Sequence, residues 1–244
     1  MGVYKIIKYT ANTYLYNLKI FLLFSIAFLI AFLIPLFASV PTYNDLGSIF
    51  LRSFNIYYNF NLIDLIVIIA STLFSALFLS FAIVVINLIV KQKRTDVKIN
   101  RYIIEGIEKY IGRVFVVLLI FTFVLLFLNL ILYNYNYSSI IIYVIAILLT
   151  PFFLYAPSSI VIEERSIKNS VIQSSKFFFK KLNYFLVFLI LGILLLSIPA
   201  FIFDFILNPV LSGYLQMVID SIFILPFLVL LLCEFYISKF AMLK

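Results

Sequence analysis

The chain has 244 residues, of which 66% are hydrophobic and 11% are charged, and its formal net charge is +8. Soluble domains contain roughly 45–50% apolar and about 25% charged residues, so this composition excludes an ordinary water-facing globule. The single cysteine excludes a disulfide framework and a cysteine-based metal site. Because so much apolar surface cannot be buried in one core, the composition predicts an integral membrane protein.

Six apolar stretches are each long enough to cross a bilayer, which takes roughly 20 helical residues. The first stretch follows several lysines, as in a signal peptide, but it is longer than the ~7–15 residues of a signal-peptide core. We therefore expect a permanent span there. The predicted fold is an all-α, polytopic membrane protein that forms one domain over 1–244, with spans at about 18–40, 62–90, 114–133, 140–162, 184–207 and 214–237.

Three further segments place apolar residues at helical spacing and charged residues on their other faces. These segments, at about 3–17, 97–113 and 164–182, each lead into a span close to a basic residue. Amphipathic helices of this kind lie in the membrane interface. We expect three units, each an interfacial helix followed by a hairpin of two spans; the alternative is that these segments are ordinary amphipathic loops.

The basic residues predict the orientation. All of the 18 Lys and Arg residues except Arg52 flank the spans on one side. Because Lys and Arg accumulate on cytoplasmic loops, we expect both termini in the cytoplasm and the protein in the cell membrane. The charge does not indicate nucleic-acid binding. Cations at this surface attract anionic lipid headgroups at about 1 kcal/mol each, although they can also serve only to set the topology.

Seven cations form the predicted cytoplasmic surface for lipids or a protein partner. They come from the second and third amphipathic segments and are Arg101, Lys109, Arg113, Lys168, Lys176, Lys180 and Lys181. Besides membrane lipids, a second copy of the chain or another membrane protein is an expected partner.

Small residues predict which span is central, because helices in lipid associate by close packing. The span 62–90 carries the best stripe, made of Ser71, Thr72, Ser75, Ala76, Ser80 and Ala82. In the fourth span, Pro157 is expected to end or bend the helix, since proline removes a helical hydrogen bond and clashes with the preceding turn. Ser166 is the expected N-cap of the helix that follows.

Acidic residues supply the remaining candidate site. Asp204 and Asp220 are both eight residues from Ser212, which we take as the midpoint of the last hairpin loop. They are therefore expected at one depth near the outer face, with Asp64 at a similar level. Close carboxylates share a proton or bind a cation. Wetted helix ends are the simpler interpretation, and Glu234 is expected to pair with a cytoplasmic lysine.

The segment 151–182 carries the most specific pattern. A proline-containing span ends at Glu163 and Glu164, a helix with Ser170 and Ser174 in S-x-x-x-S spacing follows, and the sequence KKLNYF leads into the next span. This pattern resembles six-span prokaryotic and archaeal membrane proteins of unknown function, similar to the membrane domain of some glycerophosphodiester phosphodiesterases. The catalytic barrel of those larger proteins has no counterpart in this sequence, so the resemblance implies a membrane module without enzyme activity.

Motifs for catalysis are missing from the sequence. There is no histidine, no glycine-rich phosphate loop and no G-x-S-x-G motif. Glu163 and Glu164 are expected to begin a helix, where acids complement the helix dipole. We therefore predict no enzyme, and no catalytic, cofactor-binding or metal-binding residue. A membrane scaffold or accessory protein is the favoured function; the alternative is a permease-like subunit of an export-type ABC transporter, with 97–113 as the coupling helix that docks on an ATPase.

Overall fold

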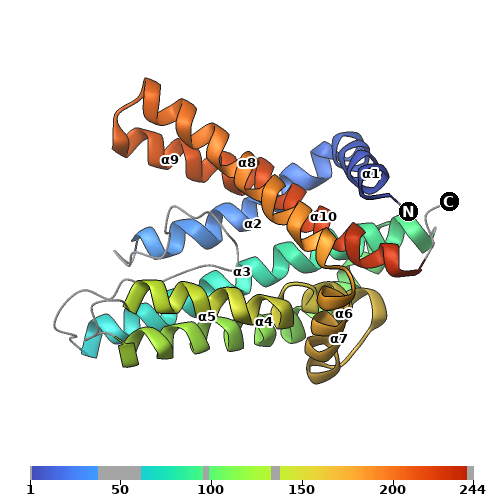
Figure 1. Ribbon diagram of the computed structural model, residues 1–244, viewed down its shortest axis with the longest axis horizontal. Helices are drawn as coiled ribbons and strands as arrows, with labels where there is room; N and C mark the ends of the chain where they lie inside the picture. Colours follow the sequence, from blue (N-terminus) through green and yellow to red (C-terminus); the bar gives the residue numbers. More distant parts are fainter. Residues whose placement is uncertain (1, 38–61, 96–98, 133–137, 241–244) are drawn as a thin grey trace.

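The computed structural model describes residues 2–37, 62–95, 99–132 and 138–240 (Figure 1). In these residues it contains helices and turns but no strand, which confirms the predicted all-α class. The elements are α1 (Val3–Tyr16), α2 (Leu18–Phe37), α3 (Leu62–Thr95), α4 (Ile99–Leu132), α5 (Ser138–Phe153), α6 (Ala156–Glu163), α7 (Ile167–Lys180), α8 (Leu182–Ile206), α9 (Pro209–Ile219), the π-helix η1 (Asp220–Ile224), α10 (Leu225–Ile237) and the 3-10 helix η2 (Ser238–Phe240).

Several helices are long and apolar enough to cross a membrane. Among the described residues these are Ile69–Lys93, Ile140–Glu163, Leu182–Ile206 and Leu211–Phe240. The bent pair α1–α2, over Val3–Tyr16 and Leu18–Ile34, is a fifth if it counts as one span. This set agrees with a polytopic membrane protein. The predicted total of six spans and the orientation of the termini stay predictions.

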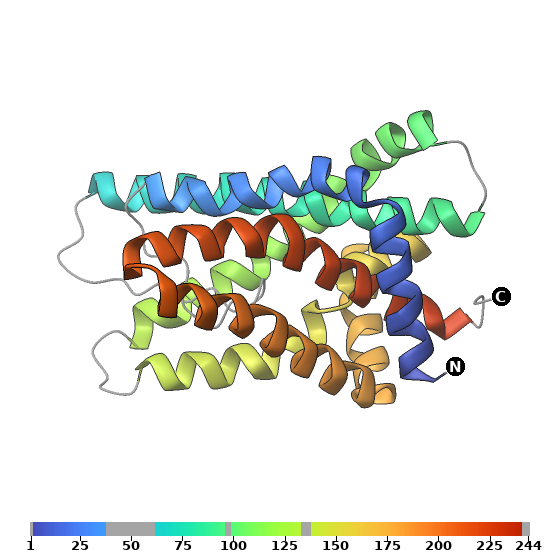
Figure 2. The same cartoon turned by 90° about the horizontal axis from the view of Figure 1, so that it is seen from above.

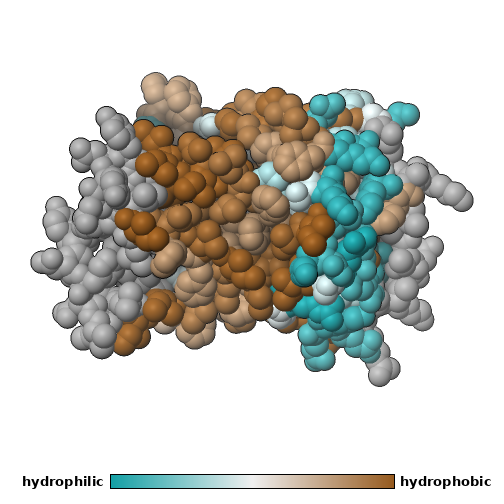
Figure 3. All heavy atoms as spheres, turned by 60° about the horizontal axis from the view of Figure 1, so that its bottom comes forward, coloured by the Kyte–Doolittle hydropathy of each residue, from teal (hydrophilic) through white to brown (hydrophobic). Residues whose placement is uncertain are grey.

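The two ends of the molecule differ in polarity. Figure 2 shows the start of α1 and the end of α10 at the same end of the helical bundle, where α7 also lies. Figure 3 shows one face on which hydrophobic side chains cover the middle and hydrophilic side chains gather toward that end. Both features fit the expectation that most of the basic residues lie on one side of a membrane.

The central position predicted for the second span is confirmed. In α3, 72% of the most apolar stretch is buried, compared with 6% in α8. All six residues of its small-residue stripe are buried. The Ser75 hydroxyl donates a hydrogen bond of 2.7 Å to the carbonyl of Ala31 in α2. Small side chains therefore let the α2 and α3 backbones approach closely, as helices in lipid require.

Two of the three predicted amphipathic segments form separate helices. The axes of α1 and α2 differ by 90° across Asn17, and α7 is separated from α8 by a break at Lys181. Their location in a membrane interface stays a prediction. Ser166 occupies the N-cap position of α7, as predicted, but its side chain makes no capping hydrogen bond.

The prediction of a separate helix over 97–113 is wrong for its described part, because residues 99–113 belong to the same helix as the span that follows. Instead, α4 continues from Ile99 to Leu132 without a break. One buried stripe runs along it through Gly106, Tyr110, Val114, Val117, Phe121 and Leu125. A Cβ atom at Gly106 would lie 2.6 Å from Leu88 of α3. The first part of α4 thus packs on α3 as part of the same helix that carries the span.

The interruption of the fourth span predicted at Pro157 is confirmed. The helix stops after Phe153, turns at Leu154 and Tyr155, and starts again as α6 with Pro157 in its first turn. Proline at this position cannot donate a backbone hydrogen bond, and its ring clashes with the carbonyl four residues earlier. The break therefore leaves backbone polar groups that need partners inside an apolar region.

Ser174 of α7 supplies those partners. Its hydroxyl accepts a hydrogen bond from the Tyr155 backbone N–H at 3.0 Å and donates one to the Pro151 carbonyl at 2.9 Å. Ser174 and Ser170 are fully buried on the face that α7 turns toward α5 and α6. Serine is small enough for close helix packing and still carries a donor and an acceptor. The S-x-x-x-S spacing thus docks α7 onto the broken span.

Replacing Ser174 by alanine is predicted to destabilise the protein, because two buried backbone groups lose their partner. The expected loss is about 1–3 kcal/mol in free energy of unfolding. Thermal unfolding of detergent-purified S174A measures it. The control is S175A, the same substitution at the neighbouring, less buried serine, which should change the unfolding temperature little. Equal shifts in the two variants would contradict the capping role.

Candidate functional site at the α6–α7 junction

The turn between α6 and α7 brings two carboxylates to the end of the bundle. Glu163 is the last residue of α6, and Glu164 follows with φ 57° in the left-handed region. Among the described residues, no other non-glycine residue has a positive φ. The prediction that these acids begin a helix is wrong, because α7 starts only at Ile167. A left-handed conformation costs a non-glycine residue roughly 1–2 kcal/mol, so the contacts of Glu164 must offset it.

Glu164 joins three parts of the chain. Its carboxylate lies 2.9 Å from the Lys91 ammonium of α3 and 2.5 Å from the Lys109 ammonium of α4. Lys91 also donates a hydrogen bond of 2.9 Å to the carbonyl of Val161 in α6. Both ammonium groups lie over the ring of Tyr110, at 5.3 and 5.2 Å from its centroid. The end of α6 is therefore fixed to α3 and α4 by charge.

Glu163 makes a second set of contacts toward the C-terminal helices. Its carboxylate pairs with Arg165 at 2.6 Å and with Lys239 of η2 at 3.0 Å. The Tyr236 hydroxyl of α10 donates a hydrogen bond to the same carboxylate. Together, Glu163, Glu164, Lys91, Lys109, Arg165, Tyr236 and Lys239 form what we call the junction.

The pKa of Glu164 is lowered to about 2. The hydrogen bond from Lys109 makes the largest contribution, and the hydrogen bond from Lys91 the next largest. The same contact with Glu164 raises the pKa of Lys109. The Glu164 side chain keeps 48% of its surface exposed, so water screens these charges. At neutral pH the Glu164 carboxylate is therefore ionised and the Lys109 ammonium is protonated. The ion pairs of Glu164 therefore hold the end of α6 against α3 and α4 at this pH.

Aromatic rings pack beside the junction where α6, α7, α8 and α10 meet. Tyr155 and Phe177 have centroids 4.8 Å apart, Phe177 and Tyr236 5.1 Å, and Tyr184 and Phe235 4.9 Å. Such pairs contribute about 0.5–1.5 kcal/mol beyond burial of their area. These buried rings pack α6, α7, α8 and α10 together on one side of the ion pairs.

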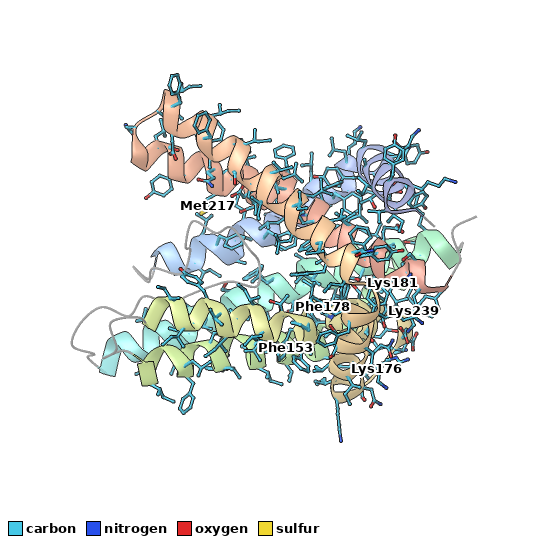
Figure 4. All side chains as sticks on the ribbon, viewed as in Figure 1. Phe153, Lys176, Phe178, Lys181, Met217 and Lys239 are labelled. Atoms are coloured by element: carbon cyan, nitrogen blue, oxygen red, sulfur yellow. The ribbon has the colours of Figure 1, made fainter. Side chains whose placement is uncertain are left out.

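The predicted lipid or partner surface divides into two sets. Lys109 belongs to the junction, and Arg113 donates a 3.5 Å hydrogen bond to the Arg165 carbonyl. The side chain of Arg101 falls outside the described residues. The other four predicted cations are exposed on or next to α7; we call Lys168, Lys176, Lys180 and Lys181 the lysine face. Figure 4 places Lys176, Lys181 and Lys239 at this end of the bundle.

No carboxylate of the described residues lies within ion-pair distance of the lysine face. Lys181 instead lies 5.4 Å from the centroid of the Tyr184 ring. The opposite side of α7 holds Ser170, Ser174, Phe177 and Phe178, all buried. The junction therefore neutralises one set of cations inside the protein and leaves another set directed outward.

The predicted pairing of Asp204 with Asp220 is not supported by the hairpin geometry. The turn lies at Leu207 and Asn208 rather than at Ser212, because Asn208 caps α9 by accepting a 2.9 Å hydrogen bond from the Leu211 N–H. Ser212 consequently donates a hydrogen bond to Asp204. At 1.5 Å per residue, Asp220 lies about 18 Å from the turn and Asp204 about 6 Å. The two carboxylates therefore lie at different depths.

Asp64 and Glu234 are the other two acids that the sequence analysis singled out. The side chain of Asp64 falls outside the described residues. Glu234 is buried in α10, at 1% exposure, and its predicted pairing with a lysine stays a prediction. Within the described residues, no three His, Cys, Asp or Glu side chains are grouped so that they could hold a metal ion.

Sequence reasoning missed the junction, because no local pattern pairs its residues. Lys91 directly follows a continuous buried run of α3, residues 82–90, and from the sequence alone it belongs only to the basic residues that predict the orientation. Its distance from Glu164 in the sequence gave no reason to pair the two.

Comparison with known proteins gives no identification. No family model matches the chain, and neither a curated protein nor a solved structure matches it significantly. The resemblance of the segment 151–182 to six-span membrane proteins therefore stays a prediction, and the site has to be interpreted from its own geometry.

Acid is predicted to weaken the protein through Glu164. The pKa of this carboxyl is about 2 in the folded protein, below its ordinary value of 4.5. Its stabilising effect is therefore complete above pH 4.5 and is lost as the pH falls toward 2. Thermal unfolding of E164Q should show a smaller drop over this range than the wild type. E108Q, which changes an exposed glutamate of α4, should follow the wild-type curve; identical curves for E164Q and wild type would refute the prediction.

Proposed function

We propose that this chain is an integral membrane scaffold or accessory protein that organises anionic lipids through its cytoplasmic surface. The observation that carries the proposal is the separation of its cations into two sets: a set at the junction that is neutralised by Glu163 and Glu164, and the lysine face, which has no carboxylate partner among the described residues. A scaffold surface of this kind needs no reacting group.

The position of the lysine face suits a phospholipid. Lys168, Lys176 and Lys180 recur at multiples of four residues and so share one side of α7. Lys180 and Lys181 lie where α7 ends and the apolar helix α8 begins. In α8 only 6% of the most apolar stretch is buried. If these lysines bind the phosphate of a phospholipid, the acyl chains of that lipid would lie alongside α8. Exposed leucine and isoleucine side chains of α8 can contact the acyl chains there.

The fixed position of α7 supports the same proposal. Ser174 holds α7 on the broken span, and the junction holds the turn before it. A surface that is ordered before the lipid arrives loses less entropy on binding than a mobile loop would.

No observation favours the permease alternative over this one. That alternative needs 97–113 as a coupling helix, but the described part of the segment is continuous with the rest of α4 and packs on α3. Lys109, which an ATPase would contact in that alternative, already forms an ion pair with Glu164.

Native mass spectrometry of the protein from mild detergent tests the proposal. The triple variant K176Q/K180Q/K181Q should retain fewer phosphatidylglycerol molecules than the wild type, while retention of phosphatidylcholine should not change. Three cations at about 1 kcal/mol each correspond to at most roughly a 150-fold loss of affinity.

The control is K5Q/K8Q/K19Q, which removes the same charge from the exposed lysines of α1 and α2. An equal loss in both triple variants would show that the lysine face has no special role. Unchanged retention in both would contradict lipid binding, and a stoichiometric ATPase in the complex would favour the permease.

A further inference from the structure

Two helices of the chain, α1 and α7, repeat the same arrangement. Each has 14 residues, and each is followed by a single residue, Asn17 or Lys181, and then by an apolar helix. Over 2–16 and 166–180, exposed, half-buried and buried residues follow one another in the same order at every position. The two stretches have no identical residue at matching positions, so the repeat lies in how the helices pack.

The inner face of both helices is covered by protein. In α1 this face contains Thr10 and Tyr14, both buried, and it packs on α10. The Tyr14 hydroxyl also donates a 3.1 Å hydrogen bond to the carbonyl of Phe223 in η1. In α7 the matching face packs on α5 and α6, where Ser174 donates to the Pro151 carbonyl. The apolar stripe with which a free amphipathic helix would contact lipid is therefore already used inside the protein.

The opposite face of each helix carries an exposed apolar side chain at the same place. Leu15 of α1 and Phe179 of α7 occupy matching positions, and they are 66% and 68% exposed. Contact between water and a large apolar side chain is unfavourable. On α7 the exposed residue next to Phe179 is Lys180, whereas on α1 the matching residue is Tyr16. The feature that the two outer faces share at this place is thus the apolar side chain and not the charge.

These two side chains lie where the next apolar helix begins. The axes of α1 and α2 differ by 90°, and Figures 1 and 2 show α1 and α7 lying across the long axis of the bundle at the same end. Leu15 and Phe179 each precede the first residue of the following helix by about 4.5 Å along the chain. From there the exposed apolar surface continues onto Leu23 of α2 and onto Leu182 and Leu186 of α8.

We propose that α1 and α7 are two matching membrane anchors, which insert Leu15 and Phe179 among the lipid acyl chains of the leaflet at this end of the bundle. The binding strength of a helix that lies in the membrane interface increases with the apolar area it buries in lipid. The partner is a lipid tail, so the contact does not depend on the anionic headgroups of the function proposed above. It also gives α1, which carries no residue of the lysine face, a contact with the membrane.

Tryptophan fluorescence tests the proposal, because the chain contains no tryptophan. L15W and F179W each place one reporter in the full chain, which is reconstituted in vesicles of phosphatidylcholine alone. Both tryptophans should emit at the short wavelength typical of apolar surroundings. Both should lose emission when phosphatidylcholine brominated on its acyl chains replaces the ordinary lipid. The absence of anionic lipid keeps this result independent of the lysine face.

Two further variants serve as controls. F201W, at a residue of α8 that is 75% exposed, should be quenched by the brominated lipid. I104W, at a residue that is 62% exposed, lies about 15 Å before Val114 on the straight helix α4 and should not be quenched. All four positions are exposed, so the variants should keep the wild-type unfolding temperature. If either L15W or F179W behaved like I104W, the proposal of two matching anchors would be overturned.

Discussion

The Glu164 carboxylate receives Lys91 from α3 and Lys109 from α4, and this contact determines where the chain leaves the bundle after α6. It holds Glu164 in a left-handed conformation that a residue with a side chain would otherwise avoid. The direction of α7 follows from that turn. Since Ser174 then reaches the broken backbone at Tyr155 and Pro151, the ion pairs and the serine contacts support each other. The outward direction of the lysine face depends on both.

Charge is used in two ways at this end of the molecule. The cations of the junction are neutralised by Glu163 and Glu164, and they tie α3, α4, α6 and α10 together. The cations of the lysine face have no such partner among the described residues and lie beside the apolar surface of α8. A positively charged protein surface next to a membrane attracts anionic lipids. When the surface is held in one position, the lipids bind at defined places on the protein. This division of the basic residues is the physical basis of the scaffold proposal.

Local patterns in the sequence predicted much of the fold. Apolar length indicated helices for lipid, the small residues of α3 indicated its central position, and Pro157 indicated the break. Errors arose where a tertiary contact decided the outcome. Residues 99–113 are part of α4, where Gly106 packs against Leu88 of α3, and the last hairpin turns at Asn208 because its side chain caps α9. The junction could not be predicted, since Lys91 and Glu164 are far apart in the sequence and only the folded chain brings them together.

The central claim is that the junction positions the lysine face for anionic lipid. Native mass spectrometry of E164Q at neutral pH tests it most directly, because this variant leaves every lysine of α7 in place. The account predicts that E164Q retains less phosphatidylglycerol than the wild type at equal phosphatidylcholine retention. Wild-type retention of phosphatidylglycerol by a folded E164Q protein would contradict it and would show that the lysines act independently of the turn that carries them.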